Sequence, residues 1–434
     1  MKALLVGGGA REHAMAKRLS EGSEIFSVMK NNNPGIARLA KNFLLESETN
    51  VDKVVEFALK EKVDFAVVGP EAPLEKGLAD ALEAKKIPTV GACQKAALLE
   101  TNKLFCRQFM RDNGIHCIPD FFVFDTASEA EDFLKGMEKA VVKPLGLTGG
   151  KGVKVMGEQV SKQEAIDYAK SLVGKDGMVL IEDYLDGEEF SLQAFVSGDA
   201  LVEMPLVQDH KRVFENDRGP NTGGMGAYSE ANHLLPFVTE AEKNEALEAM
   251  HQTIRALKAG GVEYKGFLYG QFMLTRHGPK LIEYNARLGD PEAMNVLSLL
   301  KGDFTELCWK IIDGKLDASN VKFEHKATVV KYIVPEGYPD NPLKGIEISV
   351  DESKISNAGA ELFYASVSEE GGRIISGGSR AIAVLGKGDS VGEAERIAQK
   401  AVETIGGKVH YRKDIGTREL IEKRIEHVKK LKGQ

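Results

Sequence analysis

The chain is poor in cysteine and has no long apolar run. Its four cysteines, Cys93, Cys106, Cys117 and Cys308, form no Cys-x-x-Cys pair, and its nine histidines show no zinc-like spacing. Thiols distributed in this way fit a reducing compartment. No stretch approaches the roughly 20 apolar residues of a membrane span, and the apolar run at 3–6 is too short for a secretory signal. We therefore expect a cytoplasmic protein with no membrane partner.

An excess of positive charge is also missing. The sequence has 57 Lys and Arg against 65 Asp and Glu, a net charge of −8, which disfavours nucleic acid as a partner. Hydrophobic residues make up 43% of the chain and charged residues 28%, as in globular proteins. Because 434 residues exceed what one ordinary hydrophobic core holds, we expect roughly two to four domains.

The first glycine-rich turn lacks part of a dinucleotide-binding fingerprint. Gly7, Gly8 and Gly9 follow an apolar strand, but Glu12 stands where the third glycine belongs. The second strand ends in Lys30 and three asparagines, with no acidic residue to bind a ribose. These departures disfavour a dinucleotide-binding oxidoreductase. The start of the following helix still suits a single phosphate, and a simple tight turn is the alternative.

A second glycine-rich loop, at 144–152 (PLGLTGGKG), lacks the residue order of a P-loop. Its four glycines let backbone N–H groups approach phosphate oxygens, and a strand is predicted on each side of it. We expect a hairpin lid over phosphates, with a plain flexible hairpin tip as the alternative. Lys143 ends the preceding strand, and an inward lysine there is costly to bury unless it meets a fixed anion.

Apolar strands that end in glycine alternate with helices over 1–100, which predicts an α/β fold with a doubly wound parallel sheet. Ligands of such sheets bind at the carboxyl ends of the strands. The strands expected here are 3–6, 25–29, 65–68 and 89–91, with a helix over 11–19.

Shorter patterns organise the rest of the chain, with a domain boundary expected near 320–325. Helices are expected at 101–117, 164–172, 239–258, 291–312, 390–405 and 418–431. Strands are expected at 121–124, 140–143, 153–156, 179–184, 189–196, 269–274, 280–284, 327–334, 361–368, 373–376 and 381–385. The glycine-rich segment at 376–380 (SGGSR) is interpreted as an ordinary turn, with an approach to the substrates as the alternative.

Residues 283–294 (EYNARLGDPEAM) are the most informative segment. On a strand, Glu283 and Asn285 share one face, where a carboxylate and an amide oxygen can hold one hard cation. Arg287 lies on the same face if the strand continues, and the turn that follows brings Asp290 to its mouth. Such a row suits metal-bound triphosphate. The alternative is a half-buried edge strand with a solvated outer face.

Two further segments are rich in polar residues. At 180–189 (LIEDYLDGEE) a strand leads into a short hinge, where Glu182 can take the exocyclic amine of an adenine and Glu189 the ribose hydroxyls. An acidic turn is the alternative there. Residues 209–228 form a long polar, glycine-rich loop, and a loop of that length inside a compact domain is typical of a functional segment.

Lys143, the loop at 144–152, the acidic hinge and the Glu-x-Asn-x-Arg strand occur in the order of the ATP-grasp ligases, which this chain resembles. Three stretches are similar to one family among them, the glycinamide ribonucleotide synthetases or phosphoribosylamine–glycine ligases. They are 7–14 (GGGAREHA), 219–228 (GPNTGGMGAY) and 285–292 (NARLGDPE). The resemblance runs from Met1 to about 415. One position departs from the general ATP-grasp pattern, because Gln271 stands where a first metal carboxylate is usual.

The resemblance implies a reaction in which ATP, glycine and 5-phosphoribosylamine give glycinamide ribonucleotide, ADP and phosphate, an early step of purine synthesis. Glycine's carboxylate is ionised at neutral pH, so it can attack the γ-phosphorus without a base. The resulting glycyl phosphate must be kept from water by a closing lid. The sugar amine then attacks it. The cofactors implied are ATP, as co-substrate, and Mg²⁺ or Mn²⁺.

The resemblance also implies a role for each candidate site residue. The catalytic residues expected are Lys143, Asp209 and Arg287, and the metal ligands are Glu283 and Asn285. The nucleotide is expected at Lys103, Lys143, Gly149, Gly150, Lys151, Gly152, Glu182, Tyr184, Leu185 and Glu189. Glycine and the sugar amine are expected at Gly9, Arg11, Glu12, Asp209, Asn221, Thr222, Gly223 and Asp290.

Three domains are expected: an N-terminal α/β domain at 1–100, an ATP-grasp domain at 101–320 with a mobile lid near 120–190, and a C-terminal α/β domain at 325–434. We expect a monomer with small-molecule substrates. Three alternatives stay open: an ATP-grasp enzyme for another acid and amine, such as a dipeptide ligase or carboxylase subunit, a dinucleotide-binding oxidoreductase, and a catalytically silent nucleotide-binding protein.

Overall fold

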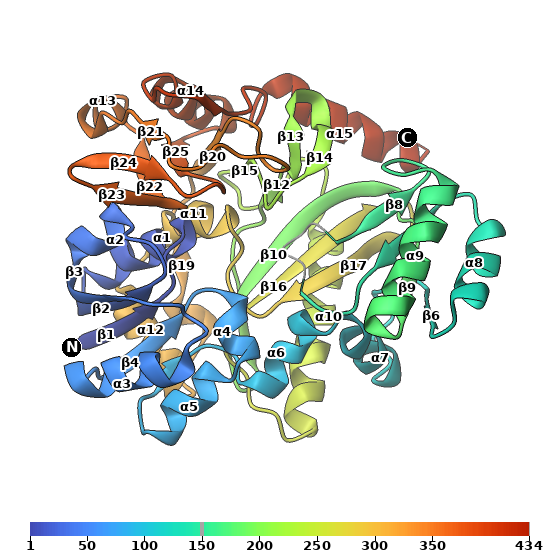
Figure 1. Cartoon of the computed structure of the whole chain (residues 1–434), viewed down its shortest axis with the longest axis horizontal. Coiled ribbons are helices and arrows are strands. Elements are labelled where there is room, and N and C mark those ends of the chain that lie inside the picture. The colour runs from blue at the N-terminus through green and yellow to red at the C-terminus, as the bar shows by residue number, and fades with distance from the viewer. Residues whose placement is uncertain (148–151, 434) are drawn as a thin grey trace.

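The computed structural model describes residues 1–147 and 152–433. Its N-terminal part, blue in Figure 1, contains a five-stranded sheet in the order β3-β2-β1-β4-β5 with every pair parallel, as predicted. The strands are β1 (Lys2–Val6), β2 (Glu24–Met29), β3 (Ala40–Leu45), β4 (Phe65–Val68) and β5 (Thr89–Val90). The helices are α1 (Ala10–Leu19), α2 (Pro34–Leu39), α3 (Val51–Glu61), α4 (Glu71–Glu75), α5 (Leu78–Ala84) and α6 (Gln94–Thr101).

The segment that follows helix α7 (Lys103–Asp112) folds around a hydrophobic cluster of its own, contributed by one sheet and two helices. The sheet has the order β6-β9-β7-β8, and Figure 1 shows it on the right of the molecule, away from the N-terminal sheet. A body with its own core can move as a unit, as a lid must. Its elements are β6 (Phe121–Phe124), α8 (Ala127–Lys135), β7 (Ala140–Lys143), β8 (Lys154–Met156), α9 (Lys162–Asp176) and β9 (Val179–Asp183).

A four-stranded antiparallel sheet, β11-β10-β16-β17, lies at the centre of the molecule. The hairpin expected between the strands at 269–274 and 280–284, across residues 276–279, is confirmed, because β16 and β17 pair from Thr275 and Gly278 onward. The elements of this part are β10 (Gly187–Ser197), β11 (Ala200–Glu203), α10 (Glu240–Ala259), β16 (Lys265–Thr275), β17 (Gly278–Asn285), α11 (Glu292–Leu297), β18 (Leu300–Lys301), α12 (Phe304–Ile312) and β19 (Lys322–Phe323).

The C-terminal part has a sheet in the order β12-β15-β20-β25-β22, in which β12 (Gln208–Asp209) and β15 (Gly226–Ser229) come from the preceding part of the chain. The remaining strands are β20 (Ala327–Pro335), β21 (Glu347–Ile348), β22 (Glu361–Tyr364), β23 (Val367–Glu370), β24 (Arg373–Ser376), β25 (Ile382–Gly388) and β26 (Val409–His410). The helices are α13 (Glu352–Asn357), α14 (Val391–Val402) and α15 (Arg418–Leu431).

Two large hydrophobic clusters join the N-terminal, central and C-terminal parts. One of them contains Leu5 from β1, Phe195 from β10, Phe304 from α12 and Val330 from β20. These three parts therefore share buried contacts and hold one another in place, unlike the separate lid core. Within the described residues, no helix has the length and apolar character needed to cross a bilayer.

Some expected elements differ in the structure. The helix expected over 101–117 is α7, which begins after Asn102, whose side chain accepts the N–H of Phe105, and which ends at Asp112, earlier than expected. The helix expected over 291–312 is interrupted by β18, and Asp303 starts α12 as its N-cap. Of the strand expected over 361–368, β22 pairs with β25, and only β23 forms the hairpin with β24.

The loop expected over 209–228 is largely ordered secondary structure. It contains β12, β13 (Arg212–Phe214), a 3-10 turn η1 (Glu215–Asp217), β14 (Arg218–Asn221) and β15. Strands β13 and β14 pair as a short hairpin. The polar composition of this segment predicts an exposed loop. Such short strands cannot be predicted from it, because they are stabilised by contacts with residues far away in the sequence.

Candidate active site

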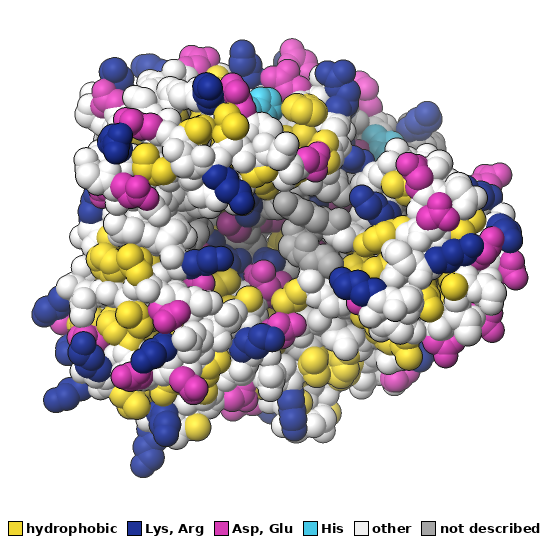
Figure 2. Space-filling view, viewed as in Figure 1, with side chains coloured by type: hydrophobic (Ala, Val, Ile, Leu, Met, Phe, Trp, Pro, Cys, Tyr) yellow, Lys and Arg dark blue, Asp and Glu magenta, His cyan; other side chains and the backbone are white. Residues whose placement is uncertain are grey.

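A cavity of about 690 Å³ lies where the N-terminal, lid, central and C-terminal parts meet. Figure 2 shows a hollow on this face near the centre of the molecule, with acidic and basic side chains around it. Its wall includes Arg11, Glu71, Lys103, Lys143, Glu182, Tyr184, Leu185, Glu189, Asp209, Asn221, Thr222, Gly223, Glu283, Asn285, Arg287, Asp290 and Arg380. Most of the candidate residues from the sequence are therefore brought together.

Strand β17 presents the expected row of polar side chains. Glu283 and Asn285 alternate with buried Tyr284, and the Oδ1 atom of Asn285 accepts a hydrogen bond of 2.9 Å from Nη2 of Arg287. Burial alone would raise the pKa of Glu283, but the charges of Lys211 and its neighbours outweigh burial and hold that pKa below its ordinary value. Glu283 is thus an ionised carboxylate beside an amide oxygen.

Arg287 is held by two carboxylates from the N-terminal part. Its Nε atom lies 3.3 Å from Glu71 at the start of α4, and its Nη2 atom lies 3.1 Å from Glu100 at the end of α6. The other oxygen of Glu100 accepts the N–H of Ala286 at 2.7 Å. Burial raises the pKa of Glu100 to about 7. The sequence reasoning missed both carboxylates, although Glu71 follows β4 at a carboxyl end where ligands are expected.

Lys143 and Glu182 face each other across the lid sheet. Nζ of Lys143 lies 2.6 Å from Oε2 of Glu182, and Nε of Arg107 donates to Oε1 at 2.7 Å. Arg107 also donates to the carbonyl of Ile282, next to Glu283. Burial disfavours the charged form of Glu182, yet Arg107 and Lys143 lower its pKa. Both carboxylate oxygens are therefore in use, and Arg107 is a member of the site that the sequence did not single out.

The remaining nucleotide candidates line the hinge and the start of the lid loop. Nζ of Lys103 donates to the carbonyl of Gly146 at 2.7 Å, and burial lowers the pKa of Lys103. The hydroxyl of Tyr184 donates to Glu158 at 2.5 Å. The carbonyl of Gly152 accepts from Tyr168. Gly149, Gly150 and Lys151 lie outside the described residues.

Glu189 and Gln271 are partners on the neighbouring strands β10 and β16. Nε2 of Gln271 donates to Oε2 of Glu189 at 2.8 Å, and Lys211 lies 3.2 Å from the same oxygen. Gln271 is opposite Glu283 in the register of β16 and β17. The part of the chain that the structure describes contains no group of three His, Cys, Asp or Glu that could hold a metal. Glu283 and Asn285 on β17 stay the predicted metal ligands.

Asp209, at the end of β12, is buried near a second carboxyl group, that of Glu292. Within the described residues its Oδ1 atom has no hydrogen-bond partner, and burial together with Glu292 raises its pKa well above the ordinary value. Gly224 has a φ of +113°, and a Cβ there would lie 2.5 Å from that oxygen. Thr222 closes this corner by donating to the carbonyl of Lys211 at 2.8 Å. The corner suits a small cationic group.

The N-terminal glycine turn is filled by Glu12. Its carboxylate accepts the N–H of Gly9 at 2.7 Å and Nε of Arg11 at 2.6 Å, in the manner of a capping box at the start of α1. A Cβ at Gly69 would lie 2.2 Å from the same carboxylate. Glu12, which replaces the third glycine of the dinucleotide fingerprint, therefore has a structural role in closing this turn. Next to this turn lies a second cavity of about 260 Å³.

Arg380 separates the two cavities and lines both. Its Nη2 atom lies 3.1 Å from Oδ2 of Asp290, and its Nη1 atom donates to the carbonyls of Asp290 and Gly223 at 2.6 Å each. The other oxygen of Asp290 accepts from Tyr332 at 2.5 Å. The turn at 376–380 therefore places a cation at the cavity wall, and its approach to the substrates, the alternative interpretation from sequence, stays a prediction.

Fold and site together define an ATP-grasp protein. A family model described as the ATP-grasp (A) domain of phosphoribosylglycinamide synthetase matches residues 101–293. The fold is similar to a biotin carboxylase domain of *Hydrogenobacter thermophilus* solved with MgADP, with a TM-score of 0.70 and 16% identity over 100% of this chain and 95% of the other. At that identity the likeness concerns the fold alone.

The other two domains of the same family also match, the N domain at residues 1–100 and the C domain at 328–418. The chain is 53% identical to the phosphoribosylamine–glycine ligase of *Pyrococcus furiosus*, over 100% of this chain and 98% of that one. It is 52% identical to that of *Methanocaldococcus jannaschii*, over the full length of both. The crystal structure of the *Thermotoga maritima* ligase superposes with a TM-score of 0.80 at 29% identity, covering 95% and 100%. The chain belongs to the phosphoribosylglycinamide synthetase family.

Proposed function

We propose that this chain is an ATP-dependent ligase that joins glycine to 5-phosphoribosylamine in purine biosynthesis, giving glycinamide ribonucleotide, ADP and phosphate. Its full-length relatives carry the name of that activity. The single observation that carries the mechanism is the group formed by Glu283 and Asn285 on β17 and Arg287 just beyond its end, which lines the same cavity as Lys143. This group distinguishes a working ATP-grasp site from a silent nucleotide-binding fold.

The nucleotide is assigned to the cleft between the lid and the central sheet. Its adenine lies against the hinge at Glu182, Tyr184 and Leu185, and its ribose lies near Glu189. Lys103 and Lys143 reach the phosphates, together with the loop glycines and Lys151. Support comes from the cavity wall and from two lysines that enter it from separate elements, α7 and β7. Binding of the phosphates would draw Lys143 away from Glu182, whose charge Arg107 continues to balance.

Glu283 and Asn285 have the donor atoms that a hard divalent ion prefers, and the positive surroundings keep Glu283 ionised. The residues present therefore fit Mg²⁺ or Mn²⁺ shared with phosphate oxygens. When bound, the ion supplies charge neutralisation at the transferring phosphoryl group. Arg287, fixed by Glu71 and Glu100, supplies a second positive charge that does not depend on the ion.

Chemistry proceeds in two transfers. The carboxylate of glycine forms a bond to the γ-phosphorus while the bond to the β,γ-bridging oxygen breaks and ADP leaves. The amine of the sugar then attacks the carbonyl of glycyl phosphate, phosphate leaves, and the amine loses a proton. Lys143 and Arg287 stabilise charge on the transferring oxygens. Asp209 holds an ammonium group or accepts the amine's proton.

The two small substrates are assigned to the region between the cavities. Asn221, Thr222 and Gly223 shape the pocket around Asp209. The sugar lies in the second cavity, against Gly9, Glu12 and Asp290, where Arg380 offers a positive charge to its phosphate. Arg11 reaches the substrates from the wall of the first cavity. We also propose the three domain limits expected from the sequence, 1–100, 101–320 and 325–434, and a monomer that acts in the cytoplasm.

An assay of ADP formation tests this proposal. ADP should appear only when glycine and 5-phosphoribosylamine are both present, and omission of either should abolish steady turnover. Steady ADP formation with a different acid and amine, and none with this pair, would assign the chain to another ATP-grasp reaction.

A further inference from the structure

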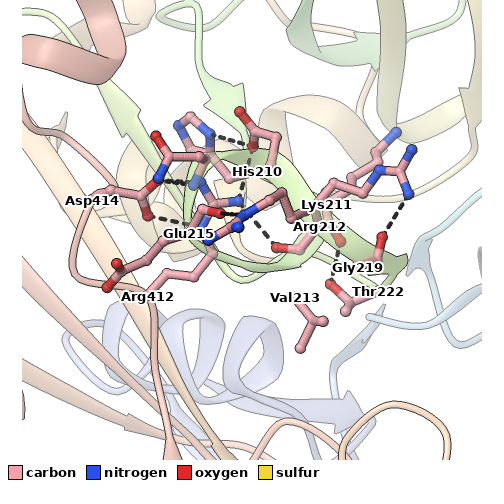
Figure 3. Close-up of polar contacts among 12 residues, drawn as sticks. His210, Lys211, Arg212, Val213, Glu215, Gly219, Thr222, Arg412 and Asp414 are labelled. Atoms are coloured by element: carbon pink, nitrogen blue, oxygen red, sulfur yellow. Dashed lines mark hydrogen bonds and ion pairs between the residues drawn. The ribbon is translucent and has the colours of Figure 1, made fainter.

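The β13–β14 hairpin carries residues of the active site at both of its ends. Lys211 precedes β13, and the segment at 221–223 ends β14 and lines the cavity. The two ends are tied together, because Thr222 donates both its N–H, at 2.7 Å, and its hydroxyl, at 2.8 Å, to the carbonyl of Lys211. Figure 3 shows these contacts beside Arg412 and Asp414 of the C-terminal segment. A shift of the hairpin would therefore move the substrate corner.

The tip of this hairpin has an unfavourable backbone. Asn216 and Asp217 are consecutive non-glycine residues with φ values of +57° and +53°. Such conformations persist where surrounding contacts over-determine them. Those contacts come from the C-terminal end of the chain. The N–H of Asn216 donates to Asp414 at 2.8 Å, and Lys423 donates to the side chain of Asn216 at 2.7 Å.

Asp217 is gripped between two arginines. Nη1 of Arg412 donates to its Oδ1 atom at 2.9 Å, and Nη2 of Arg424, on α15, contacts its Oδ2 atom. Arg412 is fully buried, is paired with Asp414 through Nε at 2.9 Å and Nη2 at 2.8 Å, and also donates to the carbonyl of Arg212 on β13 at 3.0 Å. Removal of either arginine would leave Asp217 with one charged partner instead of two.

Helix α15 makes a second attachment on the nucleotide side of the cavity. Nη1 of Arg424 lies 3.2 Å from Glu188, and Nδ1 of His427 lies 2.7 Å from the same carboxylate. Glu188 immediately precedes Glu189, which contacts Lys211. One arginine therefore bridges the hairpin carboxylate and the strand that leaves the hinge.

We propose that Arg412 and Arg424 are positioning residues of the active site: through Asp217 they hold the β13–β14 hairpin so that Lys211 and residues 221–223 meet the substrates. Neither arginine needs to touch the reacting atoms. The proposal rests on the proposed function only for the identity of the substrate that is affected, glycine. The hairpin contact itself can be tested without any substrate.

Hydrogen exchange of backbone amides tests whether the arginines hold the β13–β14 hairpin in place. Arg424→Met removes the charge and keeps a long apolar stem, while Arg418→Met is a matched control on the same helix, since Arg418 is 86% exposed and pairs with Glu422. Exchange over 212–221 should quicken in Arg424→Met and stay at the wild-type rate in Arg418→Met. Equal protection of the hairpin in Arg424→Met and wild type would overturn the proposal, whatever the enzyme's substrate.

Steady-state kinetics test whether the hairpin contact affects the use of glycine. They require a wild-type enzyme that forms ADP with glycine and the amine. Arg424→Met and Asp217→Asn should each raise KM for glycine about tenfold, and the double variant should match the single ones because the two residues act through each other. Arg424→Lys should recover part of the loss. Two results would overturn the proposal. One is a double variant whose increase in KM is the product of the two single increases. The other is a lower kcat with an unchanged KM, which a smaller folded fraction would give. A wild type that ignores glycine would instead count against the proposed function.

Discussion

Asp209→Asn should destroy use of the small substrates and at the same time stabilise the protein. The carboxyl group is buried, one oxygen has no hydrogen-bond partner within the described residues, and Glu292 adds a like charge. Burial and Glu292 raise its pKa well above the ordinary value, so the folded chain holds this group at a free-energy penalty when no cationic ligand is present. Asparagine has nearly the same shape and carries no charge.

The size of the effect follows from proton linkage. Each unit by which the fold raises the pKa of Asp209 above its unfolded value costs about 1.36 kcal/mol of stability at neutral pH. A buried asparagine amide without full hydrogen bonding offsets about 1–3 kcal/mol of this gain. We expect a net gain in stability, seen as a rise in Tm of about 2–4 °C for each kcal/mol in a cooperative unit of roughly 200 residues.

The pH dependence gives the sharper test. A raised carboxyl pKa in the folded state means that the native chain binds more protons than the unfolded chain above pH 3.9, so stability falls as pH rises. The advantage of Asp209→Asn should therefore be present at pH 7 and vanish near pH 4. Urea unfolding at the two pH values measures it, and ATP affinity should stay near that of the wild type. A variant that is less stable than wild type at pH 7, or one that still uses glycine and the amine normally, would refute the reasoning.

Three further outcomes are expected. Glu283→Gln should lower turnover about 100-fold or more, because it removes the ionised metal ligand, and a loss of only a few-fold in the ADP assay would argue against ligation. Lys143→Ala should lower turnover and weaken ATP binding, measured by titration, while Arg107 keeps Glu182 paired and the fold intact. Burial lowers the pKa of His13 to about 3, so the neutral form is favoured in the fold and stability is lost as pH falls below 6.5. Urea unfolding at pH 7 and pH 5 should show a loss of about 2 kcal/mol from this residue that His13→Asn lacks.

The secondary structure that could be predicted is the part whose signal is local. Strands β4, β6 and β7 and helix α15 have the limits expected from sequence, because apolar periodicity and flanking glycines mark them directly. The single helix expected over 291–312 was wrong for a local reason that the apolar pattern hides, since Asp303 caps a new helix, α12, after the short strand β18. The hairpin inside 209–228 depends on partners some 200 residues away, which no local pattern contains.

The same distinction between local and distant signals applies to the residues of the site. Residues grouped by a motif, such as Glu283, Asn285 and Arg287, could be found because one short segment, the end of β17 and the two residues after it, presents them together. Glu71, Glu100, Arg107 and Arg380 come from separate elements, and their role is defined by a contact with a motif residue: two hold Arg287, one holds Glu182, and one holds Asp290. A single sequence contains no record of such pairs. Only the closing of the fold brings them to the cavity.

Gln271 shows how the charge of the site is set by these distant contacts. A carboxylate at this position would stand opposite Glu283 and beside Glu189, adding a third negative charge against Lys211. The amide removes that charge and donates a hydrogen bond to Glu189, which leaves Glu283 as the ionised ligand on the row and Lys211 free to balance two carboxylates. A site with fewer acidic ligands binds a cation more weakly by itself and depends more on phosphate oxygens to complete the shell. Metal affinity in this chain should therefore rise steeply when nucleotide is bound.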